Sequence, residues 1–275
     1  MESGRNLLLF KYGGNAMTDP DLQIEILRNI CLLKKKGHSL VIVHGGGPFI
    51  KITLGEAGIE SEFIDGQRKT TPRAMKYVEM ALKGRVNGSL VSILNGMGYK
   101  AVGLSGKDGQ MVLAEKRMHQ RKENGKSISV DLGQVGDVVE VDPGLIYLLL
   151  DNDYLPVITC IASDSSGTDY NINADLFAGH IAGNLSAEQY VVLTDVDGLM
   201  LDKNDPGSLI REIKLSELQE LKDNGVIQGG MIPKVDSCRI ALEKGAVSAR
   251  IINGTVPGQI AEIFEGGDPG TVIRK

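Results

Sequence analysis

Short apolar runs alternate along the chain with segments whose apolar residues recur at helical spacing. Residues 6–13 (NLLLFKYG) and 39–44 (SLVIVH) are near-continuous apolar runs that each end at a cluster of glycines. Such runs are typical of strands buried on both faces. Residues 20–36 carry apolar side chains at mostly helical spacing and have Pro20 at their start, which predicts a helix.

The same alternation continues to the C-terminus. It predicts further helices at residues 48–57, 71–98 (one helix or two), 143–152, 173–184, 216–225, 231–245 and 257–266, and further strands at 100–106, 154–162, 188–196, 247–254 and 270–275. Residues 110–141 depart from it, because strand-like runs flank a polar stretch, HQRKENGKS (119–127). We expect a β-hairpin there, with an exposed tip.

Alternating helices and apolar strands predict an α/β fold, a three-layer αβα sandwich with a largely parallel central sheet. In such sheets, ligands bind beyond the C-terminal ends of the strands. Glycines and polar residues gather where predicted strands end, at 11–15, 44–48, 105–109 and 194–198. We therefore expect the functional site at that edge of the sheet.

Composition narrows the class of protein. The chain has 275 residues, 42% hydrophobic and 24% charged, with a net charge of −5, which argues against non-specific binding of nucleic acid. Its three cysteines have no metal-ligand spacing, which favours a reducing compartment and no structural metal. It has neither a signal-peptide pattern nor an apolar run of the roughly 20 residues that a membrane helix needs. We expect a cytoplasmic protein.

The common nucleotide-binding motifs do not fit. The GKS at 125–127 would need a glycine at position 120, which is glutamine, to form a P-loop. GMGYKA (96–101) matches a dinucleotide fingerprint in letters, but it follows a predicted helix and precedes a predicted strand, so a helix C-cap is the better interpretation.

A different set of residues nevertheless indicates phosphoryl transfer. Lys11 ends a buried strand and is followed by glycines 13–14, while glycines 45–47 lie between a strand and a helix, where backbone N–H groups favour an anion. Asp175 lies near a predicted helix start, and Lys234 follows another pair of glycines. Charge neutralisation and positioning are what phosphoryl transfer requires of a protein.

Each feature also has a plainer interpretation. Lys11 could be a lysine that reaches solvent at a sheet edge, Asp175 a charge at a helix N-terminus, and residues 194–198 (TDVDG) an Asx turn. His44, at a strand end, is more often a packed or hydrogen-bonded histidine than a base, and we assign it no catalytic role. These alternatives stay open from the residues alone.

Taken together, the motifs resemble those of the amino acid kinases, and among them the N-acetylglutamate kinases. The likeness covers nearly the whole chain, and the order and spacing of the motifs make it specific. They are KYGGNAM (11–17), VIVHGGGP (41–48), GQR with Thr70 (66–70), AVGLSGKDG (101–109), GQVGDV (133–138), YLPVI (154–158), NINAD (171–175), LTDVDG (193–198), GGMIPK (229–234) and GTVI (270–273).

The resemblance implies an ATP-dependent kinase that converts the side-chain carboxylate of N-acetyl-L-glutamate to an acyl phosphate, the second step of arginine biosynthesis. It implies one compact kinase domain, with an acceptor-binding lobe over residues 1–184 and an ATP-binding lobe over residues 185–275. Mg²⁺ would be held mainly by ATP oxygens, so no protein ligand set for a metal is expected.

The resemblance also implies roles for individual residues. Lys11 and Lys234 would stabilise the transferring phosphoryl group, and Asp175 would hold both lysines in place. The acceptor would be bound by Gly46, Gly47, Arg68 and Asn171. The nucleotide would be bound by Gly13, Gly14, Asp195, Val196, Asp197, Gly198, Leu199, Met200, Val226, Ile227 and Gln228.

Three departures from the family pattern bear on the acceptor and on regulation. Lys69 replaces a small apolar residue, which adds a cation near the expected acceptor site and leaves N-succinylglutamate or carrier-linked aminoadipate as alternative acceptors. Gly88 stands where many relatives carry lysine, and Gly258 where arginine-inhibited relatives often carry histidine. With only about five residues before the first strand, we expect a homodimer without strong arginine feedback.

Two further alternatives lie outside acylated amino acids. The first is a carbamate, uridylate or isopentenyl phosphate kinase, against which the pair Arg68 and Asn171 argues, since it suits a carboxylate-bearing acceptor. The second is a nucleotide-binding sensor without catalysis, against which Lys11, Asp175 and Lys234 argue. The role of Lys107 is left open.

Overall fold

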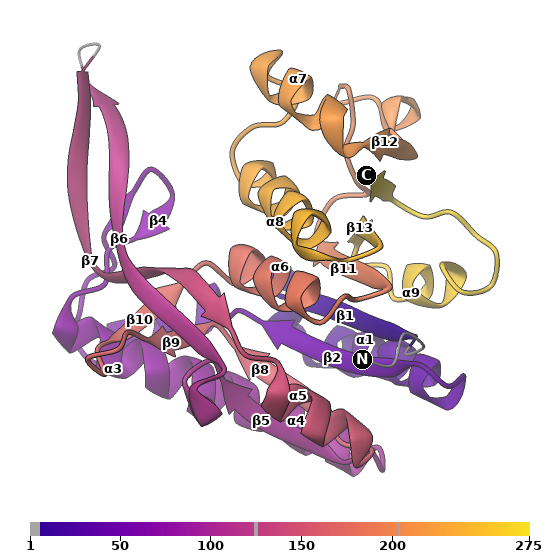
Figure 1. Cartoon of the computed structure of the whole chain (residues 1–275), viewed down its shortest axis with the longest axis horizontal. Helices are drawn as coiled ribbons and strands as arrows, with labels where there is room; N and C mark the ends of the chain where they lie inside the picture. Colours follow the sequence, from indigo (N-terminus) through magenta and orange to yellow (C-terminus); the bar gives the residue numbers. More distant parts are fainter. Residues whose placement is uncertain (1–5, 124–125, 203) are drawn as a thin grey trace.

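A central sheet crosses the molecule (Figure 1). The computed structural model describes residues 6–123, 126–202 and 204–275, and these form an eight-stranded sheet in the order β12-β14-β13-β11-β1-β2-β8-β5. The strands are β1 (Leu7–Tyr12), β2 (Ser39–His44), β5 (Ala101–Ser105), β8 (Leu155–Thr159), β11 (Gln189–Thr194), β12 (Glu212–Lys214), β13 (Ser248–Asn253) and β14 (Thr271–Arg274). The strands from β5 to β13 are parallel, whereas β14 is antiparallel to β13. The predicted α/β class with a largely parallel sheet is confirmed.

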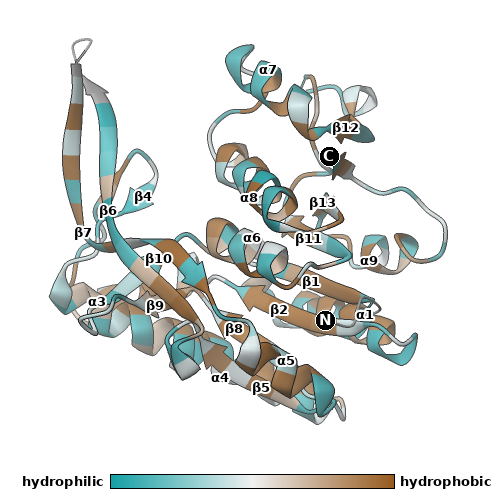
Figure 2. Cartoon of the chain, in the orientation of Figure 1, coloured by the Kyte–Doolittle hydropathy of each residue, from teal (hydrophilic) through white to brown (hydrophobic). Residues whose placement is uncertain are grey.

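Helices cover both faces of this sheet. Alternate residues of β1 face opposite sides, so that Leu7 and Leu9 belong to one buried core and Leu8 and Phe10 to the other. The first core lies under α5 (Gly144–Asp151), α6 (Ala174–Asn184) and α8 (Met231–Lys244), and the second under α1 (Pro20–Lys35), α4 (Gly88–Gly96) and α9 (Gly258–Glu262). Figure 2 shows apolar strands between helices of mixed polarity, which is the predicted three-layer arrangement.

The predicted hairpin at 110–141 is confirmed as β6 (Val112–Glu123) and β7 (Lys126–Val141), which project from the body of the molecule in Figure 1. Residues 124–125 of its expected tip lie outside the described residues. At its base the hairpin closes a small barrel with β9 (Ile161–Ser163) and β10 (Asp169–Ile172). Arg117, Val135, Asn171 and Ile172 of this barrel line a cavity described below.

One predicted strand was wrong. The run 154–162 is broken at Cys160, so that β8 joins the central sheet while β9 joins the barrel. Four short strands were not predicted: β3 (Phe63–Ile64), β4 (Gln67–Arg68), β10 and β12. The helix expected at 257–266 ends at Glu262, and the one expected at 216–225 is α7 (Leu218–Asp223).

The segment 71–98 is helical almost throughout but changes its winding. It runs from α3 (Pro72–Glu79) through a π-helix, η2 (Met80–Asn87), into α4. Thr71 caps it, because its hydroxyl accepts from the Ala74 N–H at 3.1 Å. The other elements are α2 (Gly47–Glu56), as predicted, and 3₁₀ turns at Gly14–Met17, Asp108–Gln110, Pro206–Ser208 and Leu215–Glu217. Within the described part of the chain, every helix is too short or too polar to cross a lipid bilayer.

Candidate active site

The glycine and acid clusters converge at one edge of the sheet. Strands β2, β1, β11 and β13 are parallel neighbours, so they end side by side. Lys11 pairs in register with Val43 of β2 and Val192 of β11, which places it in the middle of this edge. The loops at 45–47 and 195–200 follow the strands on either side of it.

Lys11 forms a buried ion pair with Asp175. Its Nζ lies 2.7 Å from Asp175 Oδ1, and both side chains are 9% exposed. Asp175 stands in the first turn of α6, where the Asn173 side chain caps the helix by accepting from the N–H groups of Asp175 and Leu176. The amino group also lies against Gly13, since a Cβ on that residue would be 3.1 Å from Lys11 Nζ. The helix start thus holds Asp175 in place, and the contact with Gly13 restricts the lysine amino group.

Two helix N-termini meet beside this pair. Gly46 is the N-cap of α2, and Gly45 touches the start of α6, since a Cβ on Gly45 would lie 3.1 Å from Ala174 Cβ. Gly46 lies against η2, because a Cβ on it would be 2.7 Å from Leu82 Cδ2. Helix N-termini with free backbone N–H groups favour negative charge, so the convergence suits a phosphoryl group.

A cavity of about 200 Å³ opens from these glycines. It is lined by Gly45–Gly47, Ile50, Phe63, Gly66–Arg68, Leu82, Arg117, Val135, Cys160 and Asn171–Ala174. Both predicted acceptor ligands, Arg68 and Asn171, therefore lie in one cavity with Gly46 and Gly47.

Arg68 is held at several points within this cavity. Its guanidinium donates to Ser61 Oγ at 2.5 Å and to the Gly47 carbonyl at 3.2 Å, and it lies 4.6 Å from the centre of the Phe63 ring. Burial lowers the pKa of Arg68, although guanidinium remains charged. Asn171 donates to the Thr70 hydroxyl at 3.3 Å. A fixed cation and an amide are suited to a carboxylate and an acylamide on one ligand.

Arg117 and Cys160 line the cavity and were not predicted. Arg117 reaches in from β6, where it pairs with Asp137 at 2.6 Å and donates to Gln67 Oε1 at 2.9 Å. It thus braces the short hairpin that carries Arg68. Burial raises the pKa of Cys160 to about 12, so its thiol is protonated. No local signal in the sequence could have placed either residue here, because each depends on the barrel.

Lys234 lies in the first turn of α8, the helix packed against α6. Its Nζ donates to the Gly230 carbonyl at 3.0 Å, whereas Asp175 pairs with Lys11. The two helix starts are linked by Tyr190, whose hydroxyl lies 3.2 Å from the Asp175 carbonyl and 3.1 Å from Ser237 Oγ. Ser237 in turn donates to the Lys234 carbonyl at 2.6 Å.

Of the predicted nucleotide residues, Gly13 and Gly14 follow β1, residues 195–200 follow β11, and residues 226–228 precede α8. The loop that follows β11 is tied down by two side chains: Asn253 donates to Asp197 at 2.8 Å, and Thr271 accepts from the Leu199 N–H at 2.8 Å. Val226 and Ile227 both donate to the Leu221 carbonyl and lead into α8. Asn253, at the end of β13, is a further polar residue of this edge that sequence reasoning missed.

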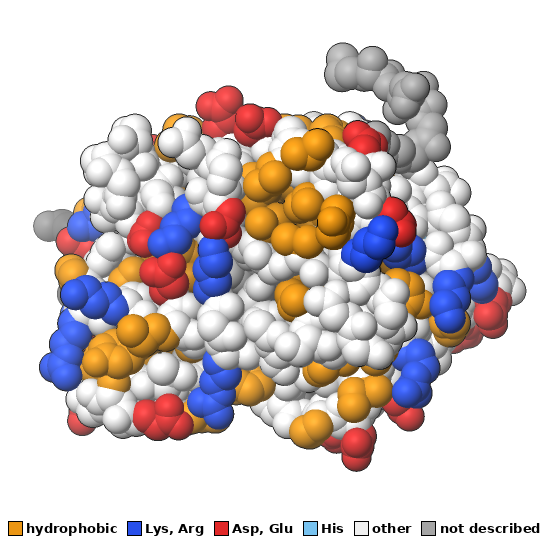
Figure 3. Space-filling view, turned by 90° about the horizontal axis from the view of Figure 1, so that it is seen from below, with side chains coloured by type: hydrophobic (Ala, Val, Ile, Leu, Met, Phe, Trp, Pro, Cys, Tyr) orange, Lys and Arg blue, Asp and Glu red, His pale blue; other side chains and the backbone are white. Residues whose placement is uncertain are grey.

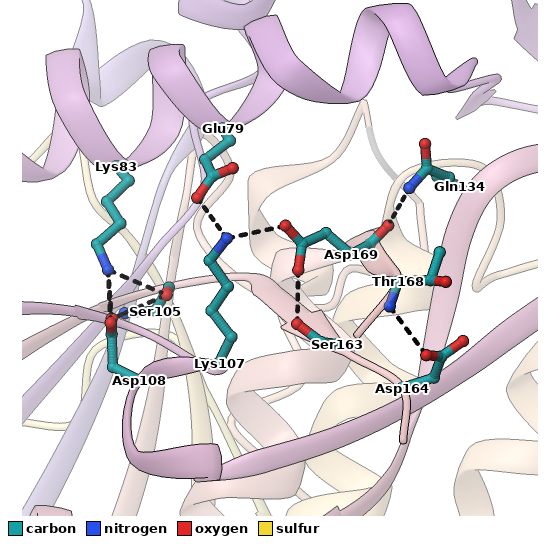
Figure 4. Close-up of polar contacts among 10 residues, drawn as sticks. All are labelled: Glu79, Lys83, Ser105, Lys107, Asp108, Gln134, Ser163, Asp164, Thr168 and Asp169. Carbon is teal, nitrogen blue, oxygen red and sulfur yellow. Dashed lines mark hydrogen bonds and ion pairs between the residues drawn. The ribbon is translucent and has the colours of Figure 1, made fainter. Parts of the chain in front are cut away.

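The two lysines of uncertain role are both ion-paired. Lys69 pairs with Glu62 at 2.9 Å and does not line the cavity. Lys107 lies between Glu79 of α3 and Asp169 of β10, at 2.6 and 2.8 Å (Figure 4). Burial lowers its pKa and the two carboxylates raise it, and the carboxylates prevail.

Figure 4 shows that the network around Asp169 also includes Ser163 and Gln134. Asp169 also accepts from Ser163 Oγ, and its carbonyl accepts from Gln134 Nε2 at 2.7 Å. Asp169 and Asn171 are two residues apart on β10 and share a face of that strand. The network therefore fixes the strand that presents Asn171.

His44 is fully buried and hydrogen-bonded at both ring nitrogens. Burial lowers its pKa to about 4, from the ordinary histidine value of 6.5. In the folded protein the ring is therefore neutral at pH 7.

This neutral histidine predicts a loss of stability in mild acid. The unfolded chain binds a proton on His44 below about pH 6.5, whereas the folded chain does so only below about pH 4, so the stabilisation is present above pH 6.5 and is lost as the pH falls to 4. The expected loss is about 3 kcal/mol. Urea titrations between pH 7 and pH 4 measure the free energy of unfolding, which should depend less steeply on pH in the His44→Asn variant. The same pH dependence in both proteins would contradict the prediction.

Known proteins match this chain over most of its length. Residues 6–253 match the amino acid kinase family. The acetylglutamate kinase of Methanocaldococcus jannaschii is 45% identical over 271 residues, which cover 98% of this chain and 90% of that protein. The acetylglutamate kinase of Moorella thermoacetica is 42% identical over 97% of this chain and 90% of that protein.

Solved structures agree on the fold. The crystal structure of smu.665 from Streptococcus mutans has a TM-score of 0.77 and 27% identity over 98% of both chains. N-acetylglutamate synthase from Neisseria gonorrhoeae, with coenzyme A and N-acetyl-glutamate, has a TM-score of 0.80 at 22% identity over 98% of this chain and 59% of its own. From its sequence matches and its fold, this chain belongs to the amino acid kinase family.

Proposed function

We propose that this protein is an acetylglutamate kinase, which transfers the γ-phosphoryl group of ATP to the side-chain carboxylate of N-acetyl-L-glutamate in arginine biosynthesis. Acetylglutamate kinases at 42–45% identity over nearly the whole chain support this function. The observation that carries it is the cavity beside Lys11, in which Arg68 and Asn171 lie together with the glycine loop. Its volume of about 200 Å³ suits a small acid.

The geometry suggests how the transfer proceeds. Arg68 binds the α-carboxylate and Asn171 the acylamide, which directs the side-chain carboxylate at Gly46 and Gly47. A carboxylate oxygen forms a bond to the γ-phosphorus as the bond from that phosphorus to the β–γ bridging oxygen breaks, leaving ADP. Lys11 and the N–H groups of Gly46 and Gly47 stabilise the negative charge on the three equatorial oxygens of the phosphoryl group in transfer.

The nucleotide occupies the other side of the sheet edge in this proposal. Residues 13–14, 195–200 and 226–228 surround it, and Lys234 reaches its transferring phosphoryl group from α8. Lys11 would then stand at the boundary between an acceptor lobe (1–184) and a nucleotide lobe (185–275). Mg²⁺ enters with ATP as part of the substrate, held mainly by phosphate oxygens.

An acyl-phosphate assay tests the proposal. Trapping the product with hydroxylamine should give a hydroxamate with N-acetyl-L-glutamate and ATP, and far less with N-succinylglutamate, aminoadipate derivatives or free glutamate. The pairing of Lys69 with Glu62 outside the cavity is the reason to expect the acetyl group over a larger anionic one. ADP release with carbamate or UMP but not with N-acetylglutamate would overturn it, as would ATP binding without any turnover.

Replacing Arg68 by methionine should raise the KM for N-acetylglutamate about 10- to 100-fold, because a charged hydrogen bond to a carboxylate is worth about 1.5–3 kcal/mol. The KM for ATP should change little. Steady-state kinetics with each substrate varied in turn measure both values. Arg73→Met, at an exposed arginine of α3, is the matched control. Equal effects on both substrates would exclude the assigned role of Arg68.

We also propose that the protein is a cytoplasmic homodimer. Figure 3 shows hydrophobic side chains gathered on the face seen from below, the side on which Figure 1 places α4, α5 and β5. There β5 is the last strand of the sheet, and Leu148 of α5 is 59% exposed. Light scattering should give about twice the 29.5 kDa mass of the chain, and Leu148→Lys should lower it. A hexamer, or strong inhibition by arginine, would contradict the proposal.

A further inference from the structure

His44 makes two hydrogen bonds whose directions are fixed by their partners. Asn87 Nδ2 lies 2.9 Å from the Val157 carbonyl, which can only accept, so the amide nitrogen is correctly placed as a donor. The same nitrogen lies 2.8 Å from His44 Nε2, which must therefore accept. The ring proton is thus on Nδ1, and it is donated to the Gly45 carbonyl at 2.8 Å.

The Gly45 carbonyl belongs to the same planar peptide as the Gly46 N–H. In a trans peptide these two groups point in opposite directions, so a hydrogen bond that fixes the carbonyl also fixes the N–H. Between two glycines the peptide lacks the side chains that would otherwise restrict its rotation. Gly46 lines the acceptor cavity, so the direction of its N–H decides whether it meets the reacting group.

The π-helix η2 supports this peptide from two sides. Asn87 at its end holds His44, while Leu82 and Val86 pack on Gly46, where a Cβ would lie 2.7 and 3.1 Å from their methyl groups. An α-helix repeats every 3.6 residues, and the wider winding of a π-helix changes which residues share a face. The π-helix thus brings three supporting side chains to one loop.

We propose that His44 and Asn87 are positioning residues, which lock the Gly45–Gly46 peptide so that the Gly46 N–H faces the phosphoryl group in transfer. This inference rests on the proposed function and adds to it a role for two residues that touch neither substrate. Asn87 fixes the tautomer of His44, and His44 fixes the orientation of the Gly45–Gly46 peptide.

Two isosteric variants separate the contacts. In His44→Asn the side-chain amide nitrogen falls where Nδ1 was, so it still donates to the Gly45 carbonyl. In His44→Gln the amide falls where Nε2 was, so the contact with Asn87 survives and the one with Gly45 is lost. Removing one preorganised donor typically lowers kcat by roughly 10²–10³-fold. We therefore expect kcat to fall at least about tenfold in the glutamine variant, which loses the contact with Gly45. In the asparagine variant, which keeps that contact, kcat should fall less than about threefold. The KM for ATP should stay within about twofold in both.

A second measurement does not depend on turnover. Hydrogen exchange of the segment around Gly46 should be faster in His44→Gln than in His44→Asn, while exchange in the core strands of both matches the wild type. If the glutamine variant does not fold, Asn87→Ala, which frees the tautomer while leaving the ring in place, should lower kcat at an unchanged KM for ATP. Equal kcat per folded molecule in the two His44 variants, with equal exchange, would overturn the inference. Failure of the wild type to phosphorylate N-acetylglutamate would instead overturn the proposed function, and the exchange comparison would still decide the role of His44.

Discussion

Replacing Lys11 by methionine should lower kcat by about 10²–10³-fold, the range observed when one preorganised group is removed from a site of charge development. The lysine is buried and lies at the centre of the sheet edge, between the acceptor cavity and the loops assigned to the nucleotide. In such an environment its charge is screened little by water, so it acts strongly on a phosphoryl group. The KM for N-acetylglutamate should change far less, because the proposed function assigns binding of the acceptor to Arg68 and Asn171.

The substitution also leaves the Asp175 carboxylate buried without its partner, which should destabilise the fold by about 3–5 kcal/mol. The double variant Lys11→Met/Asp175→Asn separates the two effects, since it should regain much of the stability but none of the kcat. Urea unfolding and steady-state kinetics measure them. Lys51→Met, at an exposed lysine of α2, is the control and should change neither. A single variant with wild-type kcat would remove Lys11 from the mechanism.

The core of the site could be predicted because it follows from local patterns. Lys11 lies near the end of an apolar strand, the glycines at 45–47 follow the next one, and the ends of parallel strands meet at one edge. The position of Asp175 could be predicted from a recognisable helix start alone. These inferences require no knowledge of which distant segments pack together.

The residues that line the acceptor cavity could not all be predicted from local patterns. Arg117 reaches it from β6 and contacts Gln67, 50 residues earlier in the chain. Alternation along a strand tells which residues share a face, but it does not tell what that face meets. The break at Cys160 has the same origin, since an apolar run fits either one strand or two until the barrel is known. His44 received no role for a related reason: its function depends on Asn87, 43 residues away.

The contact between α6 and α8 gives the second large expected effect. At Gly179 a Cβ would lie 2.4 Å from the Ser237 carbonyl oxygen, and at Gly183 a Cβ would lie 2.5 Å from Lys244 Cβ. The two helices therefore touch along their backbones. Because α6 carries Asp175, which pairs with Lys11, and α8 carries Lys234, the spacing of the two helices affects the distance between the two lysines assigned to the phosphoryl transfer.

Gly179→Ala should push these helices apart, and it should destabilise the protein by about 1–3 kcal/mol because the obstructing atom is backbone. We expect kcat to fall by about 10²-fold, since a displacement of about 1 Å in a catalytic group has an effect of that size.

The matched control is Gly88→Ala, at a glycine with helical φ and ψ and no atom within 4 Å of the added methyl group. There the same change should stabilise the protein by about 0.5–1 kcal/mol, because alanine favours a helix over glycine. Urea unfolding of both variants should thus give free-energy changes of opposite sign, and kcat should fall only for Gly179→Ala. If Gly179→Ala keeps wild-type kcat despite lost stability, the spacing of α6 and α8 does not govern the transfer, and Lys234 acts from a position that tolerates movement of its helix.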